Sequence, residues 1–292
     1  MPADFQEPAK SAPKGPRFKW RISHRTQYQY SSPVHSSFNE LHLQPFSNEE
    51  QTLESFELTV MPAARISQYH DFYSNAVHHF EIPQPHSSLS VEAELKIATH
   101  PREPLALDAK PWPFDRIGEA LRESRCHEFL GASRFVDLAP ETWRLAVEAT
   151  AGHSDTWQAA LAIMAFVNGR LRYEPKSTTV HTHIQAVLEE RRGVCQDFAH
   201  VMLGLCRTLK IPALYVSGYL ATEAASATHA WTEIFIPGVG WRGLDPTHNR
   251  QTDGQYVKIA VGRDYADVPP VAGNYRGTTD RKLEVQVRVE PA

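Results

Sequence analysis

The chain has 292 residues, of which 41% are hydrophobic and 22% are charged, and this composition excludes a mainly disordered protein. Its 15 Gly and 3 Cys also exclude collagen-like chains and small scaffolds held by disulfides. The 30 basic and 34 acidic side chains give a formal net charge of −4, so charge gives no reason to expect nucleic acid or an anionic membrane as a partner.

The first 17 residues are predicted to form a flexible leader. They contain four prolines and three basic side chains but lack the apolar stretch of a secretory signal. The longest apolar stretch, 159–167, is far shorter than the roughly 20 residues that span a bilayer. The three cysteines are odd in number and do not have the spacing of a zinc site. We therefore expect a cytoplasmic protein that does not insert into a membrane.

Residues 18–105 are predicted to form an antiparallel, sandwich-like β domain. From Phe18 to Tyr30 every second residue lies on one face of an extended strand rich in aromatic side chains, and Pro33 is expected to end that strand. Further short strands, bounded by Pro, Asn and Ser, are expected at 40–43, 55–61, 76–82 and 90–98. No long helical pattern separates them, which favours an antiparallel arrangement.

Residues 106–139 are predicted to be a linker with a possible helix, because prolines gather between 101 and 113. Residues 140–292 then form the second domain, in which helices come first and a strand meander follows. Helices are expected at 141–150, 155–171, 183–190 and from Val194 or Cys195 to a point before Pro212, and strands at 213–220, 229–236, 240–244 and, at the C-terminus, 283–289. The fold class is therefore α+β.

Cys195 is the first candidate for chemistry. Gly193 permits a tight loop before it, and the apolar stripe that follows indicates a buried helix. Cys195 then lies in the first turn, where unpaired N–H groups and the positive end of the helix dipole favour a thiolate. A cysteine near a helix start is just as often a packing residue, so this pattern alone leaves both interpretations open.

His229 and Asp245 supply the partners that a thiolate nucleophile needs, namely a base and a group that orients the base. His229 stands near the start of one expected strand and Asp245 at the end of the next, and a short turn rich in glycine joins the two strands. An antiparallel hairpin brings both residues to one end of the sheet. Asp245 can then hold one imidazole nitrogen while the other faces the start of the Cys195 helix.

These three segments resemble the signature blocks of the transglutaminase-like superfamily. The blocks are Gly193-Val194-Cys195-Gln196-Asp197, His229-Ala230-Trp231 and Leu244-Asp245-Pro246-Thr247. Looser similarities to the β-rich N-terminal domain of bacterial members are Tyr28-Gln29-Tyr30, Leu41-His42-Leu43-Gln44-Pro45 and Asp71-Phe72-Tyr73-Ser74-Asn75. The resemblance implies a papain-like fold and carries the catalytic triad over to Cys195, His229 and Asp245.

The predicted function is therefore cysteine-dependent acyl transfer on a peptide or protein substrate, without a cofactor or metal. Hydrolysis by a protease or amidase is favoured, since the domain pairing resembles bacterial proteins thought to be proteases. Transfer to an amine by a protein-glutamine transglutaminase uses the same triad and remains an alternative. A non-catalytic binding or scaffold protein is a second alternative, against which the complete triad argues. The oligomeric state is not predicted.

Other reactive side chains have simpler interpretations. Cys206 lies about 16 Å along the helix from Cys195, too far for a disulfide, and is expected in the core. Asp197 is expected to satisfy N–H groups of the first helical turn or to pair with a neighbouring arginine. His200 could line the cleft or pack beneath it. The backbone N–H of Cys195 is a natural oxyanion donor, with the Gln196 side chain or a preceding loop as possible second donors.

Overall fold

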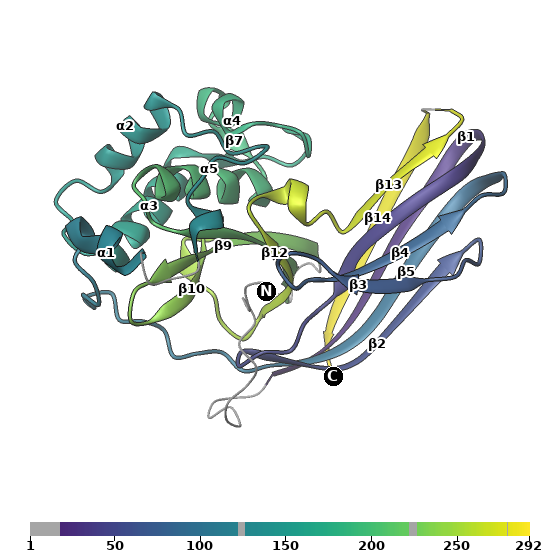
Figure 1. Cartoon of the computed structure of the whole chain (residues 1–292), viewed down its shortest axis with the longest axis horizontal. Helices are drawn as coiled ribbons and strands as arrows, with labels where there is room; N and C mark the ends of the chain where they lie inside the picture. Colours follow the sequence, from purple (N-terminus) through teal and green to yellow (C-terminus); the bar gives the residue numbers. More distant parts are fainter. Residues whose placement is uncertain (1–17, 122–125, 222–226, 279) are drawn as a thin grey trace.

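The structure, a computed structural model, describes residues 18–121, 126–221, 227–278 and 280–292. A curled N-terminal β-sheet lies beside a second part in which helices cover one side of another sheet (Figure 1). The predicted α+β class is confirmed. The predicted leader, residues 1–17, lies outside the described residues.

The N-terminal sheet is built around one long strand, β1 (Phe18–Gln44). Its first half pairs with one set of neighbours and its second half with another, all antiparallel, and the strand order is β2-β5-β1-β4-β3. The other strands are β2 (Gln51–Met61), β3 (Ser67–His70), β4 (Ala76–Ile82) and β5 (His86–Thr99). The bent sheet encloses its own apolar core, which includes Tyr30, Leu41, Phe80 and Val91. One curled sheet thus supplies both layers of the predicted sandwich-like domain.

Strand β1 does not end at Pro33, and that expectation was wrong. The pairing of β1 with β5 shifts its register between Gln29 and Val34, so Pro33 lies within an irregularity of the ladder. A proline has no N–H to donate, and a bulge is a place in a strand where a donor is not required. The chain therefore bends at Pro33 and continues as the same strand.

The C-terminal strand pairs with β1 and not with the strands of the second part. Strand β14 (Arg281–Pro291) runs antiparallel to Trp20–Tyr30, and β13 (Val271–Arg276) joins the later half of β1. From the sequence, this strand is expected at the end of the second domain, 140–292. Alternation reveals that a strand has one apolar face, but it does not encode which sheet edge the strand completes.

The helices gather around α5 (Cys195–Thr208), which is buried along nearly its whole length. It packs against α2 (Pro140–Ala149), α3 (Thr156–Arg170) and α4 (Ile184–Glu190), and on its other side against the second sheet. Asp155 caps α3 by accepting a hydrogen bond from the Trp157 N–H at 2.8 Å, which satisfies an orphan donor of the first turn. The expected linker contains the short helices η1 (Phe114–Arg116), α1 (Ile117–Leu121) and η2 (His127–Phe129).

The second sheet has the antiparallel order β11-β10-β9-β8-β12. Its strands are β8 (Ala213–Leu220), β9 (Ala227–Ile236), β10 (Gly240–Asp245), β11 (Arg250–Gln251) and β12 (Tyr256–Gly262), with a separate short pair of β6 (Arg172–Tyr173) and β7 (Arg192–Gly193). The expected hairpin between β9 and β10 is present, with Leu244 opposite Thr232. The short helix η3 (Tyr265–Asp267) follows β12 and leads back towards the N-terminal sheet (Figure 1).

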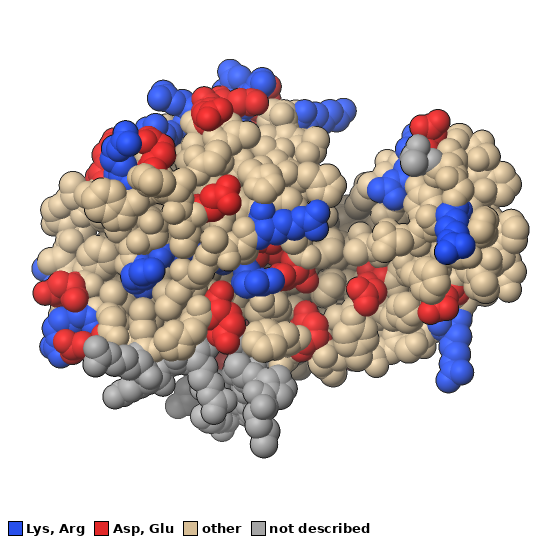
Figure 2. Space-filling model, turned by 45° about the horizontal axis from the view of Figure 1, so that its top comes forward, with Lys and Arg blue, Asp and Glu red and all other residues tan. Residues whose placement is uncertain are grey.

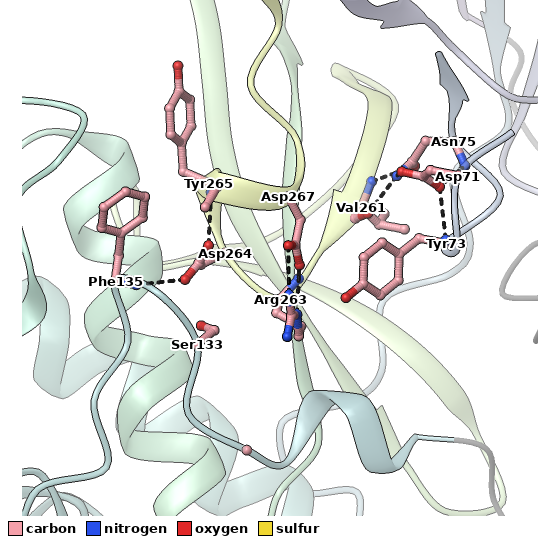
Figure 3. Close-up of polar contacts among 12 residues, drawn as sticks. Asp71, Tyr73, Asn75, Ser133, Phe135, Val261, Arg263, Asp264, Tyr265 and Asp267 are labelled. Carbon is pink, nitrogen blue, oxygen red and sulfur yellow. Dashed lines mark hydrogen bonds and ion pairs between the residues drawn. The ribbon is translucent and has the colours of Figure 1, made fainter. Parts of the chain in front are cut away.

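Two amide side chains join the N-terminal sheet to the free edge of β12. Gln51 donates to the Lys258 carbonyl at 2.7 Å and accepts from the Lys258 N–H at 2.9 Å. Asn75 donates to the Val261 carbonyl at 2.8 Å and accepts from its N–H at 2.9 Å (Figure 3). Each amide replaces the groups that a neighbouring strand would offer, so the edge of β12 is satisfied and the two parts are held in a fixed orientation.

The surface carries both signs of charge. Figure 2 shows acidic and basic side chains interspersed over the visible face, with a notch between the two lobes. Within the described ranges, no helix is both long and apolar enough to cross a membrane.

Candidate active site

Cys195 begins α5, and a buried carboxylate holds the loop before it. Asp197 accepts hydrogen bonds from the Val194 N–H at 2.7 Å and from the Thr178 hydroxyl at 2.6 Å. A Cβ on Gly193 would lie 2.6 Å from the Asp197 side chain, so only glycine lets this carboxylate fold back over the loop. Burial raises the pKa of Asp197 despite these hydrogen bonds. The backbone N–H that Asp197 satisfies is that of Val194, the residue just before the helix, and not one of the first turn as expected. This contact holds the loop that leads into Cys195.

The His229 imidazole lies between Asp245 and Cys195. Its Nε2 is 2.8 Å from Asp245 Oδ2. The ring also lines the same cavity as the Cys195 side chain, which lies near enough to influence its pKa. Because Nε2 faces the carboxylate, Nδ1 is the nitrogen left for the thiol. Burial disfavours the protonated ring, but the hydrogen bonds and charges of Asp245 and Cys195 outweigh it and raise the pKa of His229 to about 9. The structure thus brings together the three residues singled out in the sequence.

Asp245 is a fully buried carboxylate with more donors around it than the sequence revealed. Oδ2 accepts from His229, from the Tyr256 hydroxyl at 2.7 Å and from His248 Nδ1 at 2.7 Å. Oδ1 accepts from the backbone N–H groups of Thr247 at 2.8 Å and His248 at 3.2 Å. Burial alone would raise the pKa of Asp245, but these hydrogen bonds and the charge of His229 lower it far below its usual range. The side chain is therefore an ionised, immobilised acceptor.

Sequence reasoning missed Tyr256 and His248. Tyr256 lies on β12, two strands away from the β9–β10 hairpin, and its hydroxyl also accepts from Arg250 Nε at 2.8 Å. No local motif marks it, since only the sheet order brings β12 to this place. His248 is three residues after Asp245, a spacing that a search for turn-closing side chains could have found.

Trp231 supports the imidazole from the same face of β9. Its ring stacks beside His229 with centroids 6.2 Å apart and is 1% exposed. A Cβ on Gly218 of β8 would lie 2.5 Å from that indole and 2.2 Å from the Val257 carbonyl. Gly218 therefore makes the space that the indole fills. Trp231 is therefore both a core residue and a support of His229.

The remaining candidates have structural roles. The Gln196 amide donates to the Val180 carbonyl at 3.2 Å and so ties α5 to the preceding loop. His200 packs beneath the site, with its ring stacked on Phe135 and its Nε2 accepting from the Tyr265 N–H at 3.2 Å. Burial lowers the pKa of His200 to about 3, so it is neutral. Cys206 is completely buried, as expected, and burial raises the pKa of its thiol to about 12.

A metal could be held at one place in the described part of the chain, by His229, Asp245 and His248. One nitrogen or oxygen from each lies within 4.8 Å of the others. Both histidine nitrogens lie 2.7–2.8 Å from the same carboxylate oxygen, which is ordinary hydrogen-bond geometry. We therefore interpret the group as a hydrogen-bonded network around Asp245.

A cavity of about 310 Å³ opens beside Cys195 and His229. The second part of the molecule contributes Val180, Val194, Gln196, Tyr215 and Ser217. The segment after β12 contributes Tyr265, Pro270 and Val271. Thr228 and Ala230 of β9 line it as well, and the N-terminal sheet contributes residues of β1 and β14. The candidate site is therefore a cleft between the two parts of the molecule.

Two sequence profiles match the chain. The bacterial transglutaminase-like N-terminal region matches residues 20–98, and the transglutaminase-like superfamily matches residues 144–246, which include Cys195, His229 and Asp245. A Mycobacterium leprae protein of uncharacterized function is 32% identical over 92% of this chain and 98% of its own length. The chain belongs to the transglutaminase-like superfamily.

Two further relatives show how this superfamily member compares with better described proteins. A crystal structure from Cytophaga hutchinsonii, described as a candidate cysteine protease, superposes with a TM-score of 0.76 over 95% of this chain and 91% of that one, at 23% identity. This likeness confirms the fold. A Pseudomonas aeruginosa protein-glutamine gamma-glutamyltransferase is 29% identical over 138 residues, which cover 40% of this chain and 21% of that protein. The relatives support a cysteine-dependent enzyme family.

Proposed function

We propose that the protein is a cysteine-dependent acyl-transfer enzyme in which Cys195, His229 and Asp245 act as a catalytic triad on an amide or peptide bond. The observation that carries this proposal is the place of the His229 imidazole, which is hydrogen-bonded to the Asp245 carboxylate and lines the same cavity as the Cys195 thiol. Nucleophile, base and orienting carboxylate are the three parts that such a reaction requires.

The reaction follows from the charges around His229. The imidazole takes the thiol proton as the sulfur becomes the nucleophile, and its raised pKa lets it hold that proton. The sulfur attacks the carbonyl carbon, and the N–H groups at the start of α5 face the negative charge that forms on the oxygen. His229 then protonates the leaving amine as the C–N bond breaks, which leaves a thioester. A water molecule, deprotonated by His229, attacks the thioester and regenerates the thiol.

Water is the proposed acceptor of the acyl group, which makes the enzyme a protease or amidase acting on a peptide or protein. Cys195 is partly exposed in its cleft, and Thr228 beside His229 is exposed, so solvent reaches the thioester directly. The loop before His229, 221–228, is rich in small and polar residues, which do not favour a dry tunnel for an amine, but it lies largely outside the described residues. Transfer to an amine is the second candidate, favoured by the similarity to the Pseudomonas glutamyltransferase.

An excess of primary amine is expected to divert little of the acyl-enzyme. A cleft open to water does not keep water away from the thioester long enough for a dilute amine to compete. The measurement is mass spectrometry of the products formed from a peptide substrate with and without millimolar labelled alkylamine. If the amine adduct is the dominant product, the proposed reaction is amine transfer by a transglutaminase and not hydrolysis.

Tyr256→Phe is expected to lower kcat/KM by about tenfold or less and to cost about 1 kcal/mol of stability. The change removes one of the donors to Asp245, which keeps its bonds from His229, His248 and the backbone. Steady-state kinetics and urea unfolding check both values. A loss as large as that caused by changing Asp245 itself would mean that the phenol takes a direct part in the reaction.

A binding or scaffold protein is the remaining alternative, and thiol labelling distinguishes it. A scaffold has no reason to keep a reactive thiol beside a charged imidazole.

The proposal also retains the cytoplasmic location expected from the odd number of cysteines, and none of the three forms a disulfide in the structure.

A further inference from the structure

The N-terminal sheet faces the proposed catalytic cleft with an apolar surface. Along β14 the apolar side chains Leu283, Val285, Val287 and Val289 alternate with Lys282, Glu284, Gln286 and Arg288. The apolar series lies opposite Tyr28, Thr26, His24 and Ile22 of β1, so the two strands share one face. That face is turned towards the catalytic part, and the charged residues of β14 lie on the other face.

One end of this shared face packs against the catalytic part, and the other end is separated from it. Val289 and Ile22 are buried in the main core, and Val287 packs against it. Towards the other end, Val285 is 48% exposed and Leu283 is 50% exposed. The exposed pair lines the same cavity as Cys195 and His229. Two apolar side chains are thus left half uncovered at the place where a substrate must enter.

The cavity offers no fixed charge apart from the catalytic imidazole. None of the described residues that line it is Asp, Glu, Lys or Arg. His24 at its base has its pKa lowered to about 4 by burial, and its Nδ1 is 2.7 Å from the Tyr219 hydroxyl, so it is neutral. A charged side chain placed against Leu283 and Val285 would lose hydration, whereas an apolar one would gain contacts. The cations nearest to this place are the His229 imidazole and Arg281, whose guanidinium lies 5.4 Å from the centroid of the Tyr28 ring.

The wall is held in a fixed place relative to Cys195. The Gln51 and Asn75 amides fasten the N-terminal sheet to β12, and Thr99 and Trp20 both donate to the Gly254 carbonyl, at 2.6 and 3.0 Å. The segment that follows β12 is braced as well, because Asp264 accepts from the Phe135 N–H and the Ala266 N–H, both at 2.8 Å, and Arg263 pairs with Asp267 (Figure 3). Tyr265 in this segment lines the cavity opposite β14. A rigid wall can select among side chains.

We propose that Tyr28, Leu283 and Val285 form a substrate subsite that receives an uncharged, apolar side chain of the acyl-donor peptide, close to the carbonyl that Cys195 attacks. The proposal rests on the function proposed above and adds the class of substrate. A cavity of about 310 Å³ is at the small end of ligand sites, which span about 300–1,000 Å³, so it holds one or two residues of an extended peptide. The N-terminal sheet is then part of the substrate site.

The test measures how fast peptide chloromethyl ketones alkylate Cys195. These probes react with the thiol directly, and the set carries Leu, Phe, Asp or Lys as the side chain next to the reactive ketone. Each rate is divided by the rate with iodoacetamide, which has no peptide side chain. In the unaltered protein the Leu and Phe probes are expected to react about 10- to 100-fold faster than the Asp and Lys probes on this scale.

Leu283→Lys is expected to lower the relative alkylation rate of the Leu probe about tenfold and to raise the relative rate of the Asp probe. Gln286→Lys is the matched control, because it adds the same charge to the opposite, exposed face of the same strand and leaves the ratios unchanged. Val285→Thr keeps the shape of the side chain but makes it polar, and it tests the apolar subsite if the lysine variant does not fold. It is expected to weaken the apolar preference in the same direction.

The outcomes separate the two proposals. Equal ratios for all four probes, or a Leu283→Lys protein with the same ratios as Gln286→Lys, would overturn the subsite while the reactive thiol remains. A Cys195 that reacts with neither iodoacetamide nor any chloromethyl ketone would overturn the proposed function and the subsite together.

Discussion

Cys195→Ala is expected to abolish turnover while leaving the protein folded. The thiol is partly exposed at the start of α5 and lies in the same cleft as the His229 imidazole, whose pKa is raised, and no other side chain in the described cleft offers a comparable nucleophile. Removal of the nucleophile of a triad costs on the order of 10⁶-fold in rate. The measurements are kcat on a cleaved peptide and the thermal unfolding curve. Near-normal turnover would show that the chemistry lies elsewhere.

Cys206→Ala is the matched control on the same helix. Its side chain is completely buried, and burial raises the pKa of the thiol to about 12, so it is inert at neutral pH. The change leaves a small void in the core, which costs about 1 kcal/mol in the free energy of unfolding. Activity should remain. The pair separates a reactive cysteine from a packing cysteine within eleven residues of one helix.

Asp245→Asn is expected to lower kcat/KM on the order of 10⁴-fold with a much smaller effect on KM. An asparagine fills the same volume but cannot accept from His229, Tyr256 and His248 at once as the carboxylate does. The imidazole then loses both its orientation and the charge that raises its pKa. Steady-state kinetics measure the loss. A variant that retains a tenth of normal activity would remove Asp245 from the proposed triad.

The same substitution has a pH-dependent effect on stability. The pKa of His229 is raised to about 9 in the folded protein from an ordinary value of 6.5, so its protonated form stabilises the fold. That contribution is fully present below about pH 6.5 and is lost as the pH rises through about 9. The difference in unfolding free energy between the unaltered protein and Asp245→Asn is therefore expected to narrow between pH 6 and pH 10. A constant difference in urea unfolding would contradict the raised pKa.

Elements with a strong local signal were predictable from the sequence. Strands β4 and β8 coincide with the expected 76–82 and 213–220, and helices α2, α3 and α4 begin within one residue of their expected starts. The α5 helix begins at Cys195, one of the two starts considered. Hydrophobic periodicity, prolines and glycines set these boundaries, and all of them act over a few residues.

Features that depend on long-range pairing were not predictable. The apolar alternation of β14 was visible, but its place beside β1, more than 250 residues away in the chain, was not. The sequence predicts that a strand ends at Pro33. In the structure, a shift in register allows β1 to continue through this position. A short turn encodes the contact between neighbouring strands, while the edge that a distant strand occupies depends on the whole fold.

The candidate site divides in the same way. Cys195, His229 and Asp245 could be found because each stands at a recognisable boundary, a helix start or a strand end. Tyr256 could not, because its hydroxyl reaches Asp245 only through the order of strands in the sheet. The sequence predicts only that Leu283 and Val285 lie on a half-buried strand. Their position beside the thiol depends on the cleft between the two parts of the molecule.

The most direct test of the triad is the site-resolved rate of iodoacetamide alkylation in the folded protein at pH 6 to 7. Peptide mapping by mass spectrometry reports each of the three cysteines separately in one sample. The account predicts rapid alkylation of Cys195, faster than a free thiol at the same pH, with Cys206 protected until the protein unfolds. Alkylation of Cys195 no faster than that of a free thiol would contradict a nucleophile activated by the His229 imidazole.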